Sequence, residues 1–222
     1  MPYLYATLNR PLKKIQMTSF TVIIVCITSL ISFIAFSNLK LMDTLIFWPP
    51  AVSMRHQYWR FITCGFIHAD FMHLLFNMVT LYFFGTALEN YYMGDLGLQH
   101  YYFLILYILA LIFANIPTYI KRKDDYNYRS LGASGAVCAV LFAFILIRPW
   151  ETIYLYFLKL PAILYAVIFL VYSVYMSKRG GDNVNHDAHL WGALFGVVFT
   201  IAVDHSVVET FINQLSHPRL PW

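Results

Sequence analysis

The sequence predicts an all-α membrane protein built as a bundle of six transmembrane helices. Composition is the first observation behind this prediction: 60% of the residues are hydrophobic and only 12% are charged, whereas an ordinary soluble domain has about 25% charged residues. The mean hydropathy of +0.62 agrees. The second observation is that apolar runs approaching the length of a membrane-spanning helix, about 20 residues, recur along the chain. One aqueous core could not bury this much apolar surface, so lipid is the expected solvent.

The apolar runs divide the chain into three parts. Residues 1–16 are expected to form a cytoplasmic N-terminal tail, residues 17–206 a six-helix domain and residues 207–222 a C-terminal tail. Within a bilayer every backbone polar group needs an internal partner, so the runs should be helices. They are too long and too uniformly apolar for the strands of a barrel. The expected helices cover residues 17–36, 70–88, 101–119, 132–147, 161–176 and 188–203.

The charged residues lie between the apolar runs. A net charge of +4 is modest, and the basic residues form short clusters, so no nucleic-acid partner is expected. The loop 37–67 contains Trp48 and Trp59, which suit a membrane interface. Basic residues before the first helix favour a cytoplasmic N-terminus, because the first helix usually dominates orientation, although a plain count of Lys and Arg opposes this assignment.

Ser134 is the first polar residue that suggests chemistry at membrane depth, where polar groups are costly. It belongs to the motif GASG, residues 132–135, which opens the fourth expected helix. A helix N-terminus offers free backbone N–H groups that suit a developing oxyanion. The flanking glycines let another backbone come close. The alternative is a capping serine whose small neighbours serve packing alone.

His189 is the second such residue, in the motif AHLWGALFG of the sixth expected helix. His189, Gly192 and Gly196 are spaced i, i+3 and i+7, so they share one helix face. A GxxxG pair permits close helix contact, so His189 could reach Ser134 and take its proton if the sixth helix packs on the fourth. The alternative is an interfacial histidine bonded to a carbonyl group. No acid completes a triad, because Asp187 points to another side of the helix and Asp204 lies several turns away.

His73 and Asn77 form the third polar group, one turn apart near the start of the second expected helix. Both side chains can donate hydrogen bonds to the negative oxygen of a tetrahedral intermediate. The alternative is a polar contact that holds two helices together. With Ser134 and His189 they supply a nucleophile, a base and oxyanion donors, the minimum set for acyl transfer.

These motifs together resemble the rhomboid family of intramembrane serine proteases, over residues 59–196. The resemblance rests on several motifs in the same order: Trp59–Arg60, the pattern His68, His73 and Asn77, the pair Gly85 and Glu89, GASG, and the run His189, Gly192 and Gly196. It implies a rhomboid-like bundle of the bacterial type, with a short fourth helix that starts below the membrane surface.

The resemblance also implies a role for each of these residues. Ser134 would be the nucleophile and His189 the general base, with His73, Asn77 and the Ser134 backbone N–H in the oxyanion hole. His68, Arg60 and Glu89 would give structural support by pinning the first loop, and Gly192 and Gly196 would support the helix contact. The family often has an aromatic residue four positions after the serine, packed on the histidine ring. Here that residue is Cys138, which puts the support of the histidine in doubt.

The implied substrates are membrane proteins with a single span, cut near a helix end that can unwind. The fifth helix and the loop 177–187 would act as gate and cap. The implied site opens to the outer face of a bacterial inner membrane, with the lipid bilayer as a further partner. No cofactor and no metal ion are expected.

The same residues are also compatible with other functions. A catalytically inactive rhomboid-like protein would share the fold and bind transmembrane helices without cutting them. A metal site made by His68, His73 and His189 is the alternative enzyme, although the chain contains no HExxH motif. A transporter or channel would need a polar path through the whole bundle, whereas the polar residues gather near one end of the helices.

Overall fold

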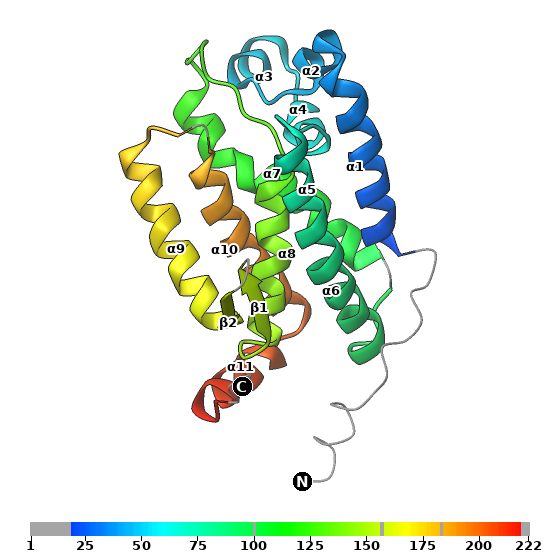
Figure 1. The fold of residues 1–222 in the computed structure, drawn as a ribbon, viewed down its shortest axis with the longest axis vertical. Helices are drawn as coiled ribbons and strands as arrows, with labels where there is room; N and C mark the ends of the chain where they lie inside the picture. Colours follow the sequence, from blue (N-terminus) through cyan, green and yellow to red (C-terminus); the bar gives the residue numbers. More distant parts are fainter. Residues whose placement is uncertain (1–18, 100, 156–157, 183, 219–222) are drawn as a thin grey trace.

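The computed structural model describes residues 19–99, 101–155, 158–182 and 184–218. The expected N-terminal tail, residues 1–16, lies outside the described residues. The described chain is a helical bundle, with α1 at one edge and α9 at the other (Figure 1). Its apolar helices are α1 (Phe20–Phe36), the continuous segment Phe71–Asp95, α7 (Tyr101–Arg122), α8 (Ser134–Ile147), α9 (Ala162–Arg179) and α10 (His186–Val203).

These helices fall within or around the six segments expected from hydropathy. In the described residues four are long and apolar enough to cross a membrane by length and composition, and α1 and α8 are apolar but shorter. The all-α membrane bundle predicted from the sequence is therefore confirmed.

The second helix continues beyond the expected end at residue 88. It consists of α5 (Phe71–Thr80), the π-helical turn η2 (Leu81–Gly85), α6 (Thr86–Asn90) and the π-helical turn η3 (Tyr91–Asp95). The predicted end was wrong because Glu89 and Asn90 are polar, a pattern typical of a helix end. Glu89 is nevertheless only 3% exposed, and its carboxylate is bonded to another helix, so the helix continues past it.

Helix α8 lies at the centre of the bundle, where it packs against α7 and α10. Its residues from Gly135 to Leu146 are all buried, because they are small or apolar and face other helices on every side. With 14 residues, at 1.5 Å each, it is about 21 Å long, which is shorter than a hydrocarbon core of about 30 Å. Figure 1 shows the chain after α7 running from one end of the bundle into its interior, where α8 begins.

The loop after α1 is folded into short helices at one end of the bundle (Figure 1). They are α2 (Leu39–Leu45), α3 (Pro49–Arg55), α4 (Arg60–Thr63) and the 3-10 turn η1 (Cys64–Phe66). Phe47, between α2 and α3, forms a two-way backbone bridge with Ser130, at 2.9 and 3.1 Å. The loop is thereby attached to the segment that leads into GASG.

Two further elements were not expected from the sequence. A short antiparallel hairpin, β1 (Thr152–Leu155) and β2 (Leu158–Pro161), joins α8 to α9 with Ile153 opposite Leu160. Helix α11 (Ser206–Ser216) occupies much of the expected C-terminal tail. It is attached to the bundle by its buried Val207 and by Gln214, whose carbonyl oxygen accepts a 2.7 Å bond from Trp150 Nε1.

Candidate active site

The structure brings Ser134 and His189 together, although 55 residues separate them in the sequence. Ser134 is the first residue of α8, and His189 lies in the first turn of α10. Nε2 of His189 is 2.8 Å from Oγ of Ser134, a hydrogen-bond distance. Both side chains are partly exposed, so a bound molecule could reach the pair.

Glycines on α10 allow this contact because they let two backbones touch. A Cβ atom placed on Gly192 would collide with the carbonyl oxygen of Gly135, and one placed on Gly196 would collide with that of Ala139. Any larger residue would push α10 away from α8. His189 lies one turn before Gly192, and Ser134 directly precedes Gly135, so this glycine seam brings the imidazole to the hydroxyl.

Ser134 sits where backbone donors are free. The first N–H groups of an α-helix have no partner within the helix, and the N-cap residue Ala133 provides no side-chain cap for α8. No acceptor in the described part of the chain bonds the backbone N–H of Ser134. A partial positive charge therefore develops at this point, where an anion would be stabilised.

His73 reaches the same loop from α5. Gly132 has a φ of +112°, a conformation that favours glycine, and a Cβ atom there would lie 2.8 Å from Cε1 of His73. The missing side chain thus makes room for the His73 ring beside GASG. Asn77 lies one turn further along α5 and is 7% exposed. One N–H of its amide donates to the His73 carbonyl oxygen at 2.9 Å, which leaves a second N–H.

His68 fixes the backbone just before Ser134. Ser32 of α1 donates its only hydroxyl proton to the Phe66 carbonyl oxygen at 2.9 Å, so at 3.0 Å it must accept from Nδ1–H of His68. Nε2 of His68 is then free to accept from the Ala133 backbone N–H at 3.3 Å. Burial, with the nearby His73 adding to it, lowers the pKa of His68 to about 3. The ring is therefore neutral, as both of its hydrogen bonds require.

No carboxylate in the described ranges bonds to either ring nitrogen of His189. Asp187 instead bonds Lys121 at 2.7 Å and Ser177 at 2.6 Å. Asp182 bonds Nε2 of His186 at 3.0 Å. The pair Ser134 and His189 is therefore a dyad in this geometry.

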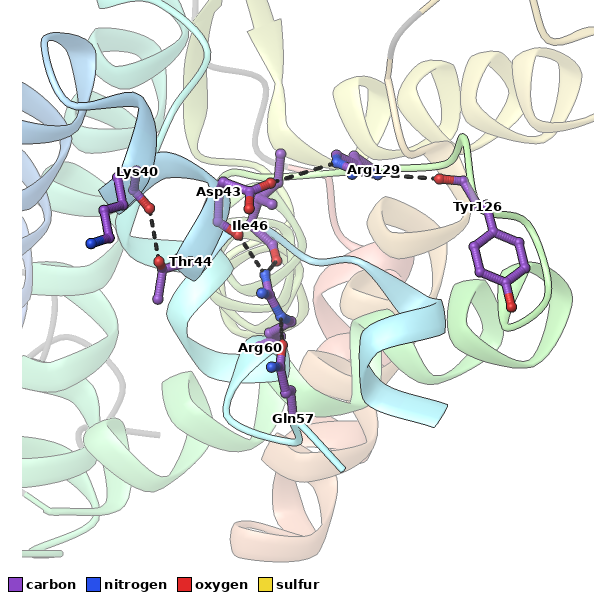
Figure 2. A network of polar contacts seen from close by, with 8 residues as sticks. All are labelled: Lys40, Asp43, Thr44, Ile46, Gln57, Arg60, Tyr126 and Arg129. Atoms are coloured by element: carbon purple, nitrogen blue, oxygen red, sulfur yellow. Dashed lines mark hydrogen bonds and ion pairs between the residues drawn. The ribbon is translucent and has the colours of Figure 1, made fainter. Parts of the chain in front are cut away.

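Arg60 holds the first loop in shape (Figure 2). Its guanidinium is buried and donates to the carbonyl oxygens of Asp43 at 2.8 Å and Ile46 at 2.5 Å, and to Oε1 of Gln57 at 2.7 Å. Ile46 directly precedes Phe47, whose backbone bridges to Ser130. Arg60 is thus connected to the GASG segment through the loop.

Glu89 does not hold the first loop, and this expectation was wrong. Its carboxylate lies at the N-terminus of α1, where it accepts bonds from Ser19 Oγ at 2.5 Å, Phe20 N at 2.9 Å and Thr21 Oγ1 at 2.9 Å. The first loop follows the other end of α1. The physical reason is that the free N–H groups and the dipole at a helix N-terminus attract a carboxylate.

Two residues near His189 were missed by the sequence reasoning. His186 lies one turn before it, with ring centroids 5.7 Å apart, and the spacing HxxH could have revealed it. Phe169 of α9 also lies beside the imidazole, with ring centroids 5.9 Å apart. No local pattern distinguishes Phe169 from the apolar residues around it. Cys138 lies in the same apolar cluster as Phe169.

A small cavity of about 20 Å³ adjoins Ser134, enough for about one water molecule. Its lining includes Cys64, Asn115, Gly132, Ser134 and Asn185. Among the described residues no group of three or more His, Cys, Asp or Glu side chains is placed to hold a metal ion. His68 could not serve as a ligand without breaking its bonds, because both of its ring nitrogens are already bonded.

The fold and site define a multi-pass integral membrane protein with a serine–histidine pair between two of its helices. The model of the rhomboid domain matches residues 55–205, and the chain belongs to the rhomboid family. It is 32% identical over 149 residues to "RHOMBOID-like protein 12, mitochondrial" of Arabidopsis thaliana, covering 62% of this chain and 44% of the relative.

Two other relatives have a comparable sequence identity to this chain. "Rhomboid-related protein 1" of Caenorhabditis elegans is 30% identical over 173 residues, covering 74% of this chain and 45% of the relative. "Putative rhomboid protease YdcA" of Bacillus subtilis is 33% identical over 146 residues, covering 65% of this chain and 66% of the relative. The matched part thus spans less than two thirds of the length of each of these relatives.

Proposed function

We propose that this protein is an intramembrane serine endopeptidase that cleaves transmembrane segments of other membrane proteins. The observation that carries the proposal is the 2.8 Å contact between Ser134 Oγ and His189 Nε2 at the N-terminus of the central helix α8. A nucleophile within hydrogen-bond reach of a base is the geometry of acyl transfer. Membership of the rhomboid family supports the same reaction.

In the first step Ser134 Oγ attacks the carbonyl carbon of the substrate peptide bond. Its proton passes to Nε2 of His189, which requires the neutral imidazole. The carbonyl oxygen becomes negative and would be stabilised by the backbone N–H of Ser134, with His73 and Asn77 as further donors. When the C–N bond breaks, His189 returns the proton to the leaving amine and the acyl group stays on Ser134.

In the second step water releases the acyl group. His189 takes a proton from the water, the hydroxide oxygen attacks the ester carbon, and Ser134 recovers its proton as the C–O bond breaks. The cavity beside Ser134 has room for one water molecule. A local supply of water matters here because the surrounding helices face lipid.

The expected substrates are proteins with a single transmembrane span. A helix must unwind before its carbonyl groups can be attacked, because its backbone groups are bonded to one another. We place the protein in a bacterial inner membrane, with a cytoplasmic N-terminus and a site open to the outer face. Labelling of single introduced cysteines from each side of intact cells tests this orientation.

The function is tested with purified protein in liposomes and a single-span reporter. Wild-type protein should cut the reporter, while Ser134→Ala and His189→Ala should each abolish cleavage and remain folded. Asn77→Ala should lower turnover less than either, because other donors remain. A serine-directed fluorophosphonate should label Ser134 in wild type and should label neither Ser134→Ala nor His189→Ala.

A folded wild-type protein that binds the reporter but neither cuts it nor reacts with the fluorophosphonate would contradict the proposal. That result would favour the other candidate, a catalytically inactive rhomboid that binds transmembrane helices.

A further inference from the structure

The imidazole of His189 is flanked by an aromatic ring from another span. The ring centroid of Phe169 lies 5.9 Å from that of His189, at an interplanar angle of 34°. Aromatic pairs attract at centroid separations of about 4.5–7 Å. Phe169 is itself held by Phe142 of α8 at 5.7 Å and by Tyr165 of α9 at 5.9 Å. The ring of Phe169 is therefore held by two other aromatic rings as well as contacting the imidazole.

Other groups constrain His189 only in part. Ser134 binds Nε2, and the ring of His186 meets the imidazole at 80°. In a catalytic triad, a hydrogen bond to a carboxylate orients the histidine ring. No carboxylate of the described chain bonds the imidazole of His189, so its rotation is not fixed in that way. On the α8 side, one turn after Ser134, Cys138 contributes only a small thiol. The ring of Phe169 is a second aromatic surface, besides His186, that lies beside the imidazole.

We propose that Phe169 is a positioning residue for His189, holding the imidazole in the plane in which Nε2 meets Ser134. This inference rests on the proposed function, since positioning a base matters only if the base acts. Phe169 touches no reacting atom and acts through His189.

The helix that carries Phe169, α9, is the least buried of the four described helices that are long enough to cross a membrane. In its most apolar window 17% of the residues are buried, against 44% for α7, and α9 lies at the edge of the bundle beside α10 (Figure 1). Gly180 and Gly181, which follow α9, both have positive φ and permit a bend there. A displacement of α9 would withdraw the ring from the imidazole, so the activity of the dyad depends on the position of α9.

The first test compares Phe169→Leu with Phe169→Tyr. Leucine keeps an apolar side chain without a ring, whereas tyrosine keeps the ring. We expect about 3- to 10-fold lower kcat for the leucine variant, the size of an aromatic pair contact, with KM almost unchanged. The tyrosine variant should match wild type, as should the control Tyr175→Leu, which removes an exposed ring from the same helix.

Labelling of Ser134 by a small fluorophosphonate provides a readout that needs no substrate helix. The labelling rate should fall for Phe169→Leu by the same factor as kcat. An unchanged kcat and labelling rate would overturn the inference. So would an effect confined to KM, because that would place Phe169 on the substrate path and not on the base.

Crystal structures of wild type and Phe169→Leu separate this inference from the proposed function. We expect His189 to leave hydrogen-bond distance of Ser134 in the variant. An unmoved imidazole would overturn the inference even if the protein is a protease. Absence of cleavage and labelling in wild type would overturn the proposed function, while a shifted imidazole would still support the positioning role.

Discussion

Asp187 lies two residues before His189, yet its carboxylate binds Lys121 of α7 at 2.7 Å and not the imidazole. The same carboxylate accepts a bond from Ser177 at the end of α9. Asp187, on α10, therefore links α10 to α7 and α9. Its position in the sequence, on another side of the helix from His189, already argues against a triad acid, and its contacts make it a structural residue.

The variant Asp187→Asn should keep proteolytic activity within about 3-fold of wild type, whereas loss of a triad carboxylate costs about 10⁴-fold. The measurement is kcat with a single-span reporter in liposomes. Lys121→Met, which removes the partner of Asp187, should have an equally small effect. If folded Asp187→Asn protein lost more than about 1,000-fold in kcat, the loss would be on the order of a triad effect. It would mean that the carboxylate turns to His189 during the reaction.

Gly192→Ala should destabilise the protein and inactivate it. The added Cβ would collide with the carbonyl oxygen of Gly135, and overpacking of this kind costs about 1–3 kcal/mol. It also separates α10 from α8, so the labelling of Ser134 should fall. Thermal unfolding in detergent and labelling rates measure the two effects.

The matched control for Gly192→Ala is Val198→Ile, which also adds one methyl group to α10. Val198 is 54% exposed, so the extra group meets no neighbouring backbone and both readings should match wild type. If Gly192→Ala and Val198→Ile had the same thermal stability and the same rate of Ser134 labelling, the glycine seam would be looser than the structure indicates.

Glu89→Gln should loosen the start of α1 and leave the dyad in place. The carboxylate accepts bonds from Ser19, Phe20 and Thr21, and an amide would turn a donor toward some of these donors. We expect a loss of about 1.5–3 kcal/mol in stability, the size of a hydrogen bond to a charged group. Hydrogen exchange should increase at residues 20–22, while folded protein still reacts with the fluorophosphonate. Glu209→Gln on α11, which is exposed, is the control.

His68 should make the protein less stable in acid. Folded His68 stays neutral down to a pKa of about 3 because it is buried, while the unfolded chain binds a proton near the ordinary pKa of about 6.5. Between these values the unfolded chain holds more protons, so the free energy of unfolding falls as the pH is lowered. From pH 7 to pH 5 this group alone should remove about 2 kcal/mol.

The variant His68→Gln isolates that contribution, because glutamine carries a donor and an acceptor but does not titrate in this range. Its stability should depend less on pH over this interval than that of wild type. Identical pH dependence of the two proteins would indicate that His68 is accessible to protons in the folded state.

The sequence could predict the contact between Ser134 and His189 because its cause is local and repetitive. Gly192 and Gly196 recur on the face that carries His189, and Gly132 and Gly135 flank Ser134. A residue without a side chain lets a second backbone come close, so a pattern of glycines by itself indicates a close helix contact. The apolar runs predicted the bundle for a similar reason, since lipid allows few alternatives.

The remaining features depend on contacts that leave no local pattern. In the sequence alone, a polar residue in an apolar run, such as Glu89, looks the same whether its partner is a loop or the N-terminus of another helix. Phe169 is one apolar residue in an apolar run, and its place beside His189 follows from how α9 packs. Helix α11 is held by contacts such as Trp150 with Gln214, between segments far apart in the chain.

The enclosure of α8 decouples the depth of Ser134 from the thickness of the bilayer. Residues Gly135 to Leu146 face other helices and not acyl chains, so α8 has no hydrophobic length to match. Outer helices such as α9 adjust to a thinner or thicker membrane by tilting. A change in lipid chain length would therefore shift a bound substrate past a stationary serine, and move the cut along the substrate.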